Sequence, residues 1–348
     1  MYTIGIIGPT LKADVCRKKE GQVLKIGKGF IQKRFLPIIR MLVAFLVMTG
    51  ASWWAVDPPI LANVTSSHFA SSTGWTREDV EREAAKLSKP PQNARIDRVW
   101  KAIPDLNGIE VDVEETWKRV QSGVRGAGGG IPWVIRQVPA EVSLKDLPPA
   151  PIYRGNGSKK QMALMVNVSW GEEHVPDLLR VLDRHQVKAT FFLDGKWVAE
   201  HGDLASAIAK AGHEIGTHGW GHPDLRGKSV GQIKQNLERS RRVIEEASGI
   251  RPALFAPPAG WYDDRVVKQA WGMGMYTIMW TLDTVDWKRP PVHLMVRRIV
   301  GHAEPGALVL MHPTPGTPAA LESIIQGLRG KGYDLVTVSN LLSPERPL

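Results

Sequence analysis

From residue 161 onward, apolar runs of strand length alternate seven times with segments of helical periodicity. The run at 162–168 is nearly continuous, as in a strand that is buried on both faces of a sheet. The predicted strands are 162–168, 188–193, 214–217, 252–255, 276–281, 307–311 and 335–338. The longest intervening helix is predicted to begin after Ser229, with Gln232 as its capping partner, and to end at Gly249. This alternation predicts parallel strands that are joined by helical crossovers.

Seven strand–helix units of this kind predict an α/β fold of the distorted (β/α)7 barrel class. A doubly wound open sheet is the alternative architecture. The first strand is not followed by a Gly-x-Gly-x-x-Gly sequence, which argues against a dinucleotide-binding site.

A separate apolar segment near the N-terminus, 35–56, carries only one charge, that of Arg40. Its 22 residues would extend about 33 Å as a helix, which is enough to span a bilayer. Lysines and arginines precede it, so we expect residues 1–34 to stay in the cytoplasm and the rest of the chain to lie outside a membrane anchor. A secreted protein with a cleaved signal is the alternative, because the uncharged part, 41–56, also fits a signal segment. Residues 1–34 are then either a basic cytoplasmic tail or an extension from a misassigned start codon.

Three further segments separate this apolar segment from the α/β domain, which is expected at 161–343. Residues 57–75 are rich in proline, serine and threonine and are predicted to be a linker. The mixed pattern of 76–138 predicts a small α+β module that opens with a helix capped by Thr76. Residues 139–160 are rich in proline and are predicted to form a second linker.

Charge and cysteine content exclude several classes of function. The net charge of +10 comes mostly from residues 1–40, which hold nine Lys/Arg and two Asp/Glu. The body of the chain has no such excess, so nucleic acid is not an expected partner. The one cysteine, Cys16, excludes an intrachain disulfide and a Cys-rich zinc motif. The 13 tryptophans either pack in the core or provide flat surfaces on which sugars stack.

Polar residues collect where the predicted strands end, which is the working face of a barrel. The segments are Asn167-Val-Ser-Trp-Gly171, His218-Gly-Trp-Gly-His222, Ala256-Pro-Pro-Ala-Gly260, Asp283-Thr-Val-Asp-Trp287 and Met311-His-Pro313. Histidines and aspartates that follow separate strands indicate a functional site at this rim. The rim has no glycine-rich phosphate loop and no Lys/Arg cluster, which disfavours a phosphate-handling enzyme.

These segments, in this order over residues 161–342, resemble the polysaccharide deacetylase family, the NodB-homology domain of carbohydrate esterase family 4. More narrowly, residues 277–287 together with Leu310-Met-His-Pro313 are similar to the deacetylase-like sporulation proteins of spore-forming bacteria. The resemblance implies a metal-dependent hydrolase that removes N-acetyl groups from cell-wall polysaccharide, such as peptidoglycan or a chitin-like glycan.

The resemblance also implies roles for individual residues. His218 and His222 match the two histidines that bind a divalent metal, usually zinc, together with one aspartate. His312 matches the general acid of the family, and Asp283 resembles the aspartate that orients this histidine. The sugar groove is expected to be lined by Trp261 and Trp287.

The first segment departs from the Thr-Phe-Asp-Asp-Gly pattern of the family. Ser169 replaces the aspartate that acts as general base, and Trp170 replaces the metal-binding aspartate. Serine is a poor proton acceptor near neutral pH, and indole offers a metal no lone pair. Ala256 stands where the family has an arginine that would pair with the base, so the base and its partner are lost together.

Two hypotheses follow from this departure. In the first, a nearby carboxylate replaces the missing ones and the domain still hydrolyses acetamides. The candidate carboxylates are those of Glu172, Glu173 and Asp194. In the second, the domain is catalytically impaired, holds zinc weakly or not at all, and binds a cell-wall glycan or another envelope partner.

Overall fold

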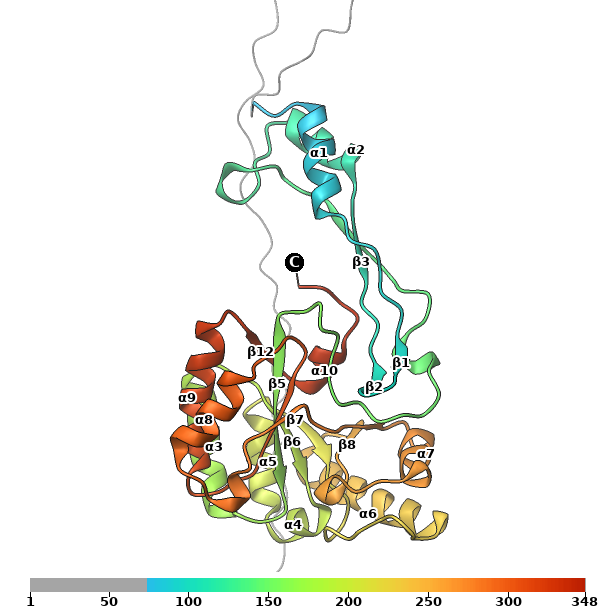
Figure 1. Ribbon diagram of the computed structural model, residues 1–348, viewed down its shortest axis with the longest axis vertical. Coiled ribbons are helices and arrows are strands. Elements are labelled where there is room, and N and C mark those ends of the chain that lie inside the picture. The colour runs from blue at the N-terminus through green and yellow to red at the C-terminus, as the bar shows by residue number, and fades with distance from the viewer. Residues whose placement is uncertain (1–73, 348) are drawn as a thin grey trace, which may run out of the picture. The chain divides into compact units, whose positions relative to one another are not determined.

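The structure, a computed structural model, describes residues 74–347 (Figure 1). The apolar segment 35–56, the basic segment before it and nearly all of the linker 57–75 lie outside the described residues. Among residues 74–347, no helix combines the length and the apolar character that crossing a bilayer requires.

An eight-stranded parallel sheet forms the centre of the α/β domain. Its strands are β5 (Gln161–Val168), β6 (Thr190–Leu193), β7 (Glu214–Thr217), β8 (Leu254–Phe255), β9 (Tyr276–Thr277), β10 (Leu282–Asp283), β11 (Leu308–Met311) and β12 (Asp334–Val336). The order β10-β11-β5-β6-β7-β8-β9, with β12 also on β5, is the circular order of a barrel that is open between β9 and β10. The α/β fold with a parallel barrel-like sheet is therefore confirmed. A doubly wound sheet, which reverses direction at a switch point, is excluded.

One predicted strand, 276–281, is divided into β9 and β10 at the opening of the barrel. Between the two, the chain pairs with Ile152: the Ile152 N–H donates to Thr277 O (2.9 Å) and the Met279 N–H donates to Ile152 O (2.8 Å). The Thr281 N–H then donates to Leu308 O of β11. The segment thus crosses from one edge of the sheet to the other, and Ile152 satisfies the backbone groups in between.

Alternation along β5 separates two apolar cores. Met162, Leu164, Val166 and Val168 face outward into the core beneath the helices, whereas Ala163 and Met165 face the barrel interior. The helices of the α/β domain are α3 (Val175–Arg184), α4 (Gly195–Glu200), α5 (Gly202–Lys210), α6 (Val230–Ser248), α7 (Asp264–Gly272), α8 (Val292–Gly301), α9 (Thr317–Gly330) and α10 (Val338–Leu342). Because the inward-facing positions continue upward from Met165, Asn167 and Ser169 come next on the interior side at the rim.

The longest helix, α6, begins and ends where the sequence predicted. The Ser229 side chain accepts a hydrogen bond from the Gln232 N–H, and the Gln232 side chain accepts one from the Ser229 N–H. Gly249 ends the helix in the left-handed region, with φ 73°. The capping chemistry written in the sequence therefore fixes both ends of this helix.

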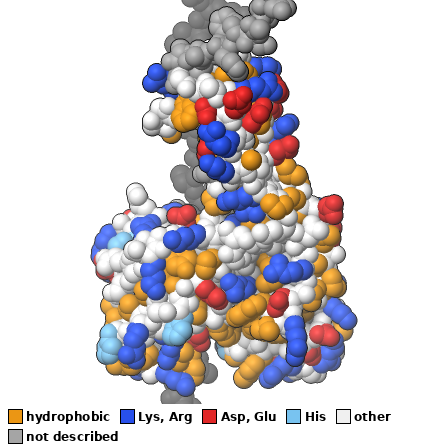
Figure 2. Space-filling view, turned by 45° about the horizontal axis from the view of Figure 1, so that its top comes forward, with side chains coloured by type: hydrophobic (Ala, Val, Ile, Leu, Met, Phe, Trp, Pro, Cys, Tyr) orange, Lys and Arg blue, Asp and Glu red, His pale blue; other side chains and the backbone are white. Residues whose placement is uncertain are grey.

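The N-terminal module contains two helices and two antiparallel strand pairs. Its elements are α1 (Arg77–Leu87), β1 (Arg95–Asp97), β2 (Lys101–Ile103), β3 (Gly108–Val111), α2 (Val113–Gln121) and β4 (Ile135–Val138). Val80, Val120 and Ile131 form its small core. Figure 2 shows acidic and basic side chains side by side over α1, where Arg77 pairs with Glu81 and Lys86 with Glu83. These exposed, mutually paired charges form a solvated face.

The proline-rich segment 139–160 and the C-terminal tail both pack against other parts of the chain. Ile152 is fully buried in the barrel core. Lys159 is also buried, and its ammonium donates to Asn340 O and Ser343 O at the end of α10. Arg346 donates from Nε to Asn107 O of the module. The segment predicted as a linker therefore contributes to the core and positions the C-terminal tail.

Acid sensitivity of the fold is predicted from His213, which is buried before β7. Its Nδ1 accepts a hydrogen bond from the Ala189 N–H, and its ring packs on Phe191. Burial, followed by the charge of Lys188, lowers the pKa of His213 to about 4. The unfolded chain, with an ordinary histidine pKa, binds the proton more readily between pH 6.5 and 4. Over this window we expect this group to cost up to about 3 kcal/mol of unfolding free energy.

The measurement is urea unfolding as a function of pH, with His213→Asn as the control. Asparagine keeps a hydrogen-bond acceptor and does not titrate. We expect the variant to be less stable at pH 7 and to lose less stability on acidification. An identical pH dependence in the two proteins would contradict the assignment.

Candidate active site

A cavity of about 370 Å³ opens at the carboxyl ends of the barrel strands. It is lined by Asn167, Ser169, Trp170, His218, His222, Ala259, Gly260, Trp280, Asp283, Trp287, Leu310 and His312. We call this the rim cavity. All five strand-end segments, or residues adjoining them, contribute to it, so the parallel sheet gathers the polar positions at one place.

His218 lies at the base of the histidine loop, residues 218–222, which follows β7. It is buried, and its Nδ1 lies 2.8 Å from Ala256 O. A carbonyl oxygen only accepts, so Nδ1 carries the proton and Nε2 keeps its lone pair. Burial, followed by the neighbouring charge of His222, lowers the pKa of His218 to about 3. The ring is therefore a neutral electron-pair donor, and its centroid lies 5.1 Å from that of His222.

Three side chains hold the histidine loop in place. Asn236 of α6 accepts from the Trp220 N–H at 3.0 Å and donates to Trp220 O at 2.9 Å. Ser240 donates to Gly219 O at 2.8 Å. Asp194 accepts from the Gly221 N–H at 2.9 Å. The loop is thus organised by the protein itself, independently of any bound group.

His312 is held by Asp286, which corrects the sequence-based assignment of this role to Asp283. Nδ1 of His312 lies 2.8 Å from Asp286 Oδ1, and Oδ2 accepts from the His312 N–H at 2.6 Å and from Thr317 Oγ1 at 3.1 Å. Asp286 is completely buried. The carboxylate fixes the Nδ1–H tautomer, so Nε2 of His312 is the free ring nitrogen.

Asp283 does line the rim cavity, but in a different setting. Its carboxylate accepts from the Val285 N–H at 2.7 Å, and burial raises its pKa. Both aspartates belong to the same strand-end segment, and sequence reasoning chose the first. Val285 lies between them in the left-handed region, with φ 55°, and the turn it makes aims Asp286 at His312. A positive φ at a valine leaves no signal in a single sequence.

The first strand-end segment brings no carboxylate into the rim cavity. Among the described residues, Ser169 Oγ and Asn167 Oδ1 are buried without a hydrogen-bond partner. The indole of Trp170 lies nearly parallel to the His312 ring, with 6.0 Å between centroids and 8° between planes. Ala256, at the position of the family's arginine, is completely buried. Trp170 therefore occupies the side of the site where the family has its acidic ligand.

The donor set does not fit a firmly held metal ion. Within residues 74–347, no group of three or more His, Cys, Asp or Glu side chains is arranged to hold one. His218 and His222 supply two nitrogens, whereas catalytic zinc sites use three protein ligands. The first strand-end segment adds only a hydroxyl and an indole N–H, which is a donor without a lone pair for a metal.

The three candidate replacement carboxylates do not line the rim cavity. Asp194 caps α4 by accepting from the Lys196 N–H, in addition to its bond with the histidine loop. Glu172 lies 4.0 Å from His201, and Glu173 lies 3.5 Å from His174. None of the three therefore lines the rim cavity, although Asp194 lies in the hollow beside it together with Ser169, Trp170 and His222.

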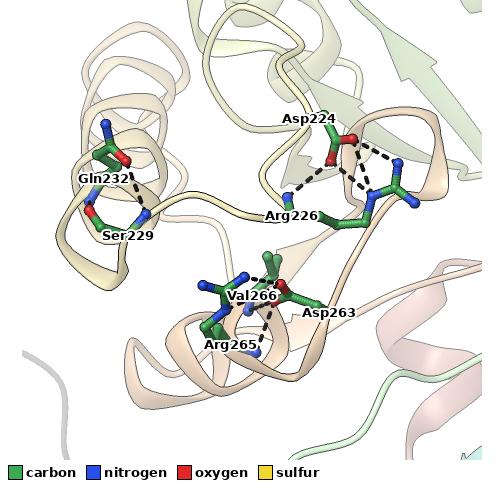
Figure 3. Close-up of polar contacts among 7 residues, drawn as sticks. All are labelled: Asp224, Arg226, Ser229, Gln232, Asp263, Arg265 and Val266. Carbon is green, nitrogen blue, oxygen red and sulfur yellow. Dashed lines mark hydrogen bonds and ion pairs between the residues drawn. The ribbon is translucent and has the colours of Figure 1, made fainter.

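Three tryptophans line the rim cavity, and only one of them belongs to the pair that the sequence predicted, Trp261 and Trp287. Trp287 lines it as predicted and is 54% exposed. Trp170 and Trp280 line it as well, although the sequence did not indicate a groove role for them. Trp261 is not among the lining residues, and the Arg226 guanidinium lies over its ring at 4.9 Å. Arg226 is itself held by Asp224 at 2.7 Å (Figure 3).

The protonation of the His312 ring tests whether Asp286 or Asp283 fixes its tautomer. At pH 8 we expect nitrogen-15 spectra of the wild-type ring to show the proton on Nδ1. Asp286→Asn should lose this preference and cost about 2 kcal/mol of unfolding free energy, because it removes a charged acceptor from a buried network. Asp283→Asn is the matched control and should keep the tautomer. Loss of the tautomer in Asp283→Asn alone would contradict the assignment.

Comparison with known proteins agrees with this geometry. The family model described as polysaccharide deacetylase matches residues 154–278. The uncharacterized protein YlxY of Bacillus subtilis is 41% identical over 271 residues, which span 78% of this chain and 84% of YlxY. The peptidoglycan-N-acetylglucosamine deacetylase PgdA of Listeria monocytogenes is 30% identical over 207 residues, which span 59% of this chain and 42% of PgdA.

A solved relative is a pseudoenzyme. The crystal structure of BA3943 from Bacillus anthracis, described as a CE4 family pseudoenzyme, is 40% identical, with a TM-score of 0.72 over 78% of this chain and 96% of that one. A BA3943 mutant, 39% identical with a TM-score of 0.72 over 78% of this chain and 99% of that one, is described as having restored enzymatic activity. The chain therefore belongs to the polysaccharide deacetylase family, carbohydrate esterase family 4.

Proposed function

We propose that this deacetylase-like protein binds N-acetylated cell-wall glycan in its rim cavity without cleaving it. One observation carries the proposal: Ser169 and Trp170 take the places of both acidic residues, and the Trp170 indole lies against His312. The site thus retains its sugar-sized cavity and loses the groups that would activate water.

The catalytic group that the site lacks is the general base. Amide hydrolysis needs a group that takes a proton from the attacking water, and such general base catalysis contributes typically ~10²–10⁴-fold. The Ser169 hydroxyl is a poor acceptor at neutral pH. Asp283 also lines the cavity, but its carboxylate accepts from the Val285 N–H, and it does not stand at the position of the family's base, which Ser169 occupies. The general acid of the family, His312, and the aspartate that holds it, Asp286, are both present.

The rim cavity retains groups that can bind a sugar. Trp170, Trp280 and Trp287 offer apolar ring faces to the cavity, and such faces suit the C–H faces of a sugar. Asn167 Oδ1 and Ser169 Oγ are buried acceptors without a partner among the described residues. A buried acceptor that is left unpaired is costly, so a ligand N–H or O–H that reaches these atoms gains affinity. The acetamido N–H and ring hydroxyls of an N-acetylhexosamine supply such donors.

A second candidate is a metal-dependent N-deacetylase whose activity is low. Two observations favour it: the intact His312–Asp286 pair, and the histidine loop held by Asn236, Ser240 and Asp194. The restored activity described for the BA3943 mutant supports the idea that such a site can regain function by substitution.

We also propose that the domain works outside the cytoplasmic membrane. The support is the apolar segment 35–56 with its basic flank and the position of the α/β domain after it. The peptidoglycan deacetylases among the relatives support a cell-wall ligand. A role in sporulation rests on the similarity of residues 277–287 to the sporulation subgroup.

The test of glycan binding compares two exposed tryptophans. Trp287 lines the cavity, with Lys288 over its ring at 4.8 Å, whereas Trp261 lies outside it, with Arg226 over its ring at 4.9 Å. We expect Trp287→Ala to weaken calorimetric binding of an N-acetylglucosamine tetramer about tenfold, because a stacking surface is lost. Trp261→Ala should leave the affinity within about twofold. Absence of binding by the wild-type chain, or equal losses in both variants, would contradict the proposal.

A further inference from the structure

A second hollow, lined mostly by charged side chains, lies against α6. It measures about 760 Å³ and shares no lining residue with the rim cavity. We call it the arginine groove. Its lining is Lys234, Gln235, Glu238, Arg239, Arg241, Arg242, Glu245, Arg251, Gly272 and Met273. Five basic residues face two acidic ones, so the lining carries a net positive charge.

Three cations of the arginine groove have carboxylate partners and two do not. Arg242 lies 3.8 Å from Glu246. Arg251 pairs with Glu245 at 2.7 Å, and Lys234 lies 3.6 Å from Glu238. In contrast, no ion pair joins Arg239 or Arg241 to a carboxylate among residues 74–347. The guanidinium of Arg239 lies over the Trp220 ring at 3.6 Å.

Arg241 has a guanidinium nitrogen that is buried without a partner among the described residues. One terminal nitrogen donates to Met273 O at 2.6 Å, while Nε is buried and has no partner in the described part of the chain. Burial, followed by the charge of Arg251, lowers the pKa of Arg241, and Glu245 only partly offsets this. Two like charges that face one hollow repel each other, and an anion bound between them would relieve the repulsion.

We propose that the arginine groove binds a linear polymer that carries phosphate groups. Guanidinium groups present paired N–H donors that match phosphate oxygens, and Arg239, Arg241, Arg242 and Arg251 supply four of them in one groove. The volume exceeds what a single phosphate ion fills, and the groove follows successive turns of α6, which suits an extended chain.

Nucleic acid is the less suitable occupant. Proteins that hold single-stranded nucleic acid stack its bases on aromatic rings. Among the residues that the structure describes, no aromatic side chain lines the arginine groove, and the nearby Trp220 ring is covered by Arg239. The groove therefore offers charge to a phosphate backbone but no surface to a base.

The arginine groove and the rim cavity are separate sites that are connected through α6 and the histidine loop. Asn236, on the same helix, holds the backbone of Trp220 in the histidine loop. Arg239 covers the ring of the same tryptophan. A polymer in the arginine groove would lie beside the loop that forms one wall of the rim cavity. The protein would then contact glycan and a phosphate-bearing polymer at adjacent sites.

The test uses the full-length chain and fluorescently labelled inorganic polyphosphate, read by fluorescence anisotropy. The test variant is Arg242→Gln with Arg251→Gln, whose side chains are 70% and 62% exposed and are ion-paired with Glu246 and Glu245. The matched control is Arg180→Gln with Arg184→Gln on α3, which are 70% and 60% exposed and ion-paired with Asp177 and Glu322. Both variants remove two exposed, paired arginines, so the net charge falls equally.

We expect the wild-type chain to bind polyphosphate and the α6 variant to lose about tenfold or more in affinity, because charge-assisted contacts are lost. The α3 control should stay within about twofold of wild type. No binding by wild type, equal losses in both variants, or tighter binding of a single-stranded DNA of the same charge would overturn the proposal. Binding of the N-acetylglucosamine tetramer, measured on the same variants, should be unchanged, so the two proposals succeed or fail separately.

Discussion

The pairing of β5 on both sides is the constraint on which the rest of the structure depends. Its residues pair with β6, β11 and β12, and every side chain from Met162 to Val168 is buried. Alternation along this strand sends one set of side chains under the helices and the other into the barrel. The same alternation delivers Asn167 and Ser169 to the rim cavity. A one-residue shift in register would remove both from the site.

The turn after β5 then fixes Trp170. Gly171 adopts φ +79°, and a Cβ at this position would lie 2.1 Å from Pro313 O. The turn is thus pressed against the residue that follows His312, which places the Trp170 indole beside the His312 ring. This turn is formed with Ser169 and Trp170 at the positions of the two family aspartates. The site differs from a hydrolase in the groups it presents, while the supports behind His218, His222 and His312 remain.

Much of this could be read from the sequence because the signals are local. The apolar runs, the capping pair Ser229 and Gln232, and Gly249 specify elements through near neighbours, and the structure places them as expected. Because the strands are parallel, their carboxyl ends meet at one rim, and His218, His222 and His312 lie together as the segment order implied. The identity of the replaced residues at 169 and 170 could be read in the same way.

The features that were missed depend on distant contacts. Asp286 was passed over for Asp283 because the turn at Val285 has a positive φ, which the sequence does not signal. Ile152 was placed in a linker, yet it pairs with the segment that crosses the opening of the barrel. The arginines of α6 look like an ordinary solvated helix face until Arg251 and Met273 are brought beside them.

The most direct test of the central claim is zinc stoichiometry and acetate release, measured side by side. The claim is that the supports of a hydrolytic site remain while its acidic groups are gone. The proteins to compare are the wild-type chain, His218→Ala, and the double variant Ser169→Asp with Trp170→Asp. We expect wild type to bind zinc no better than His218→Ala and to release no acetate from an N-acetylglucosamine oligomer. The double variant should bind about one zinc per chain, because a third protein ligand is restored, and should release acetate. Tight binding of zinc by the wild-type chain, together with acetate release, would contradict the claim.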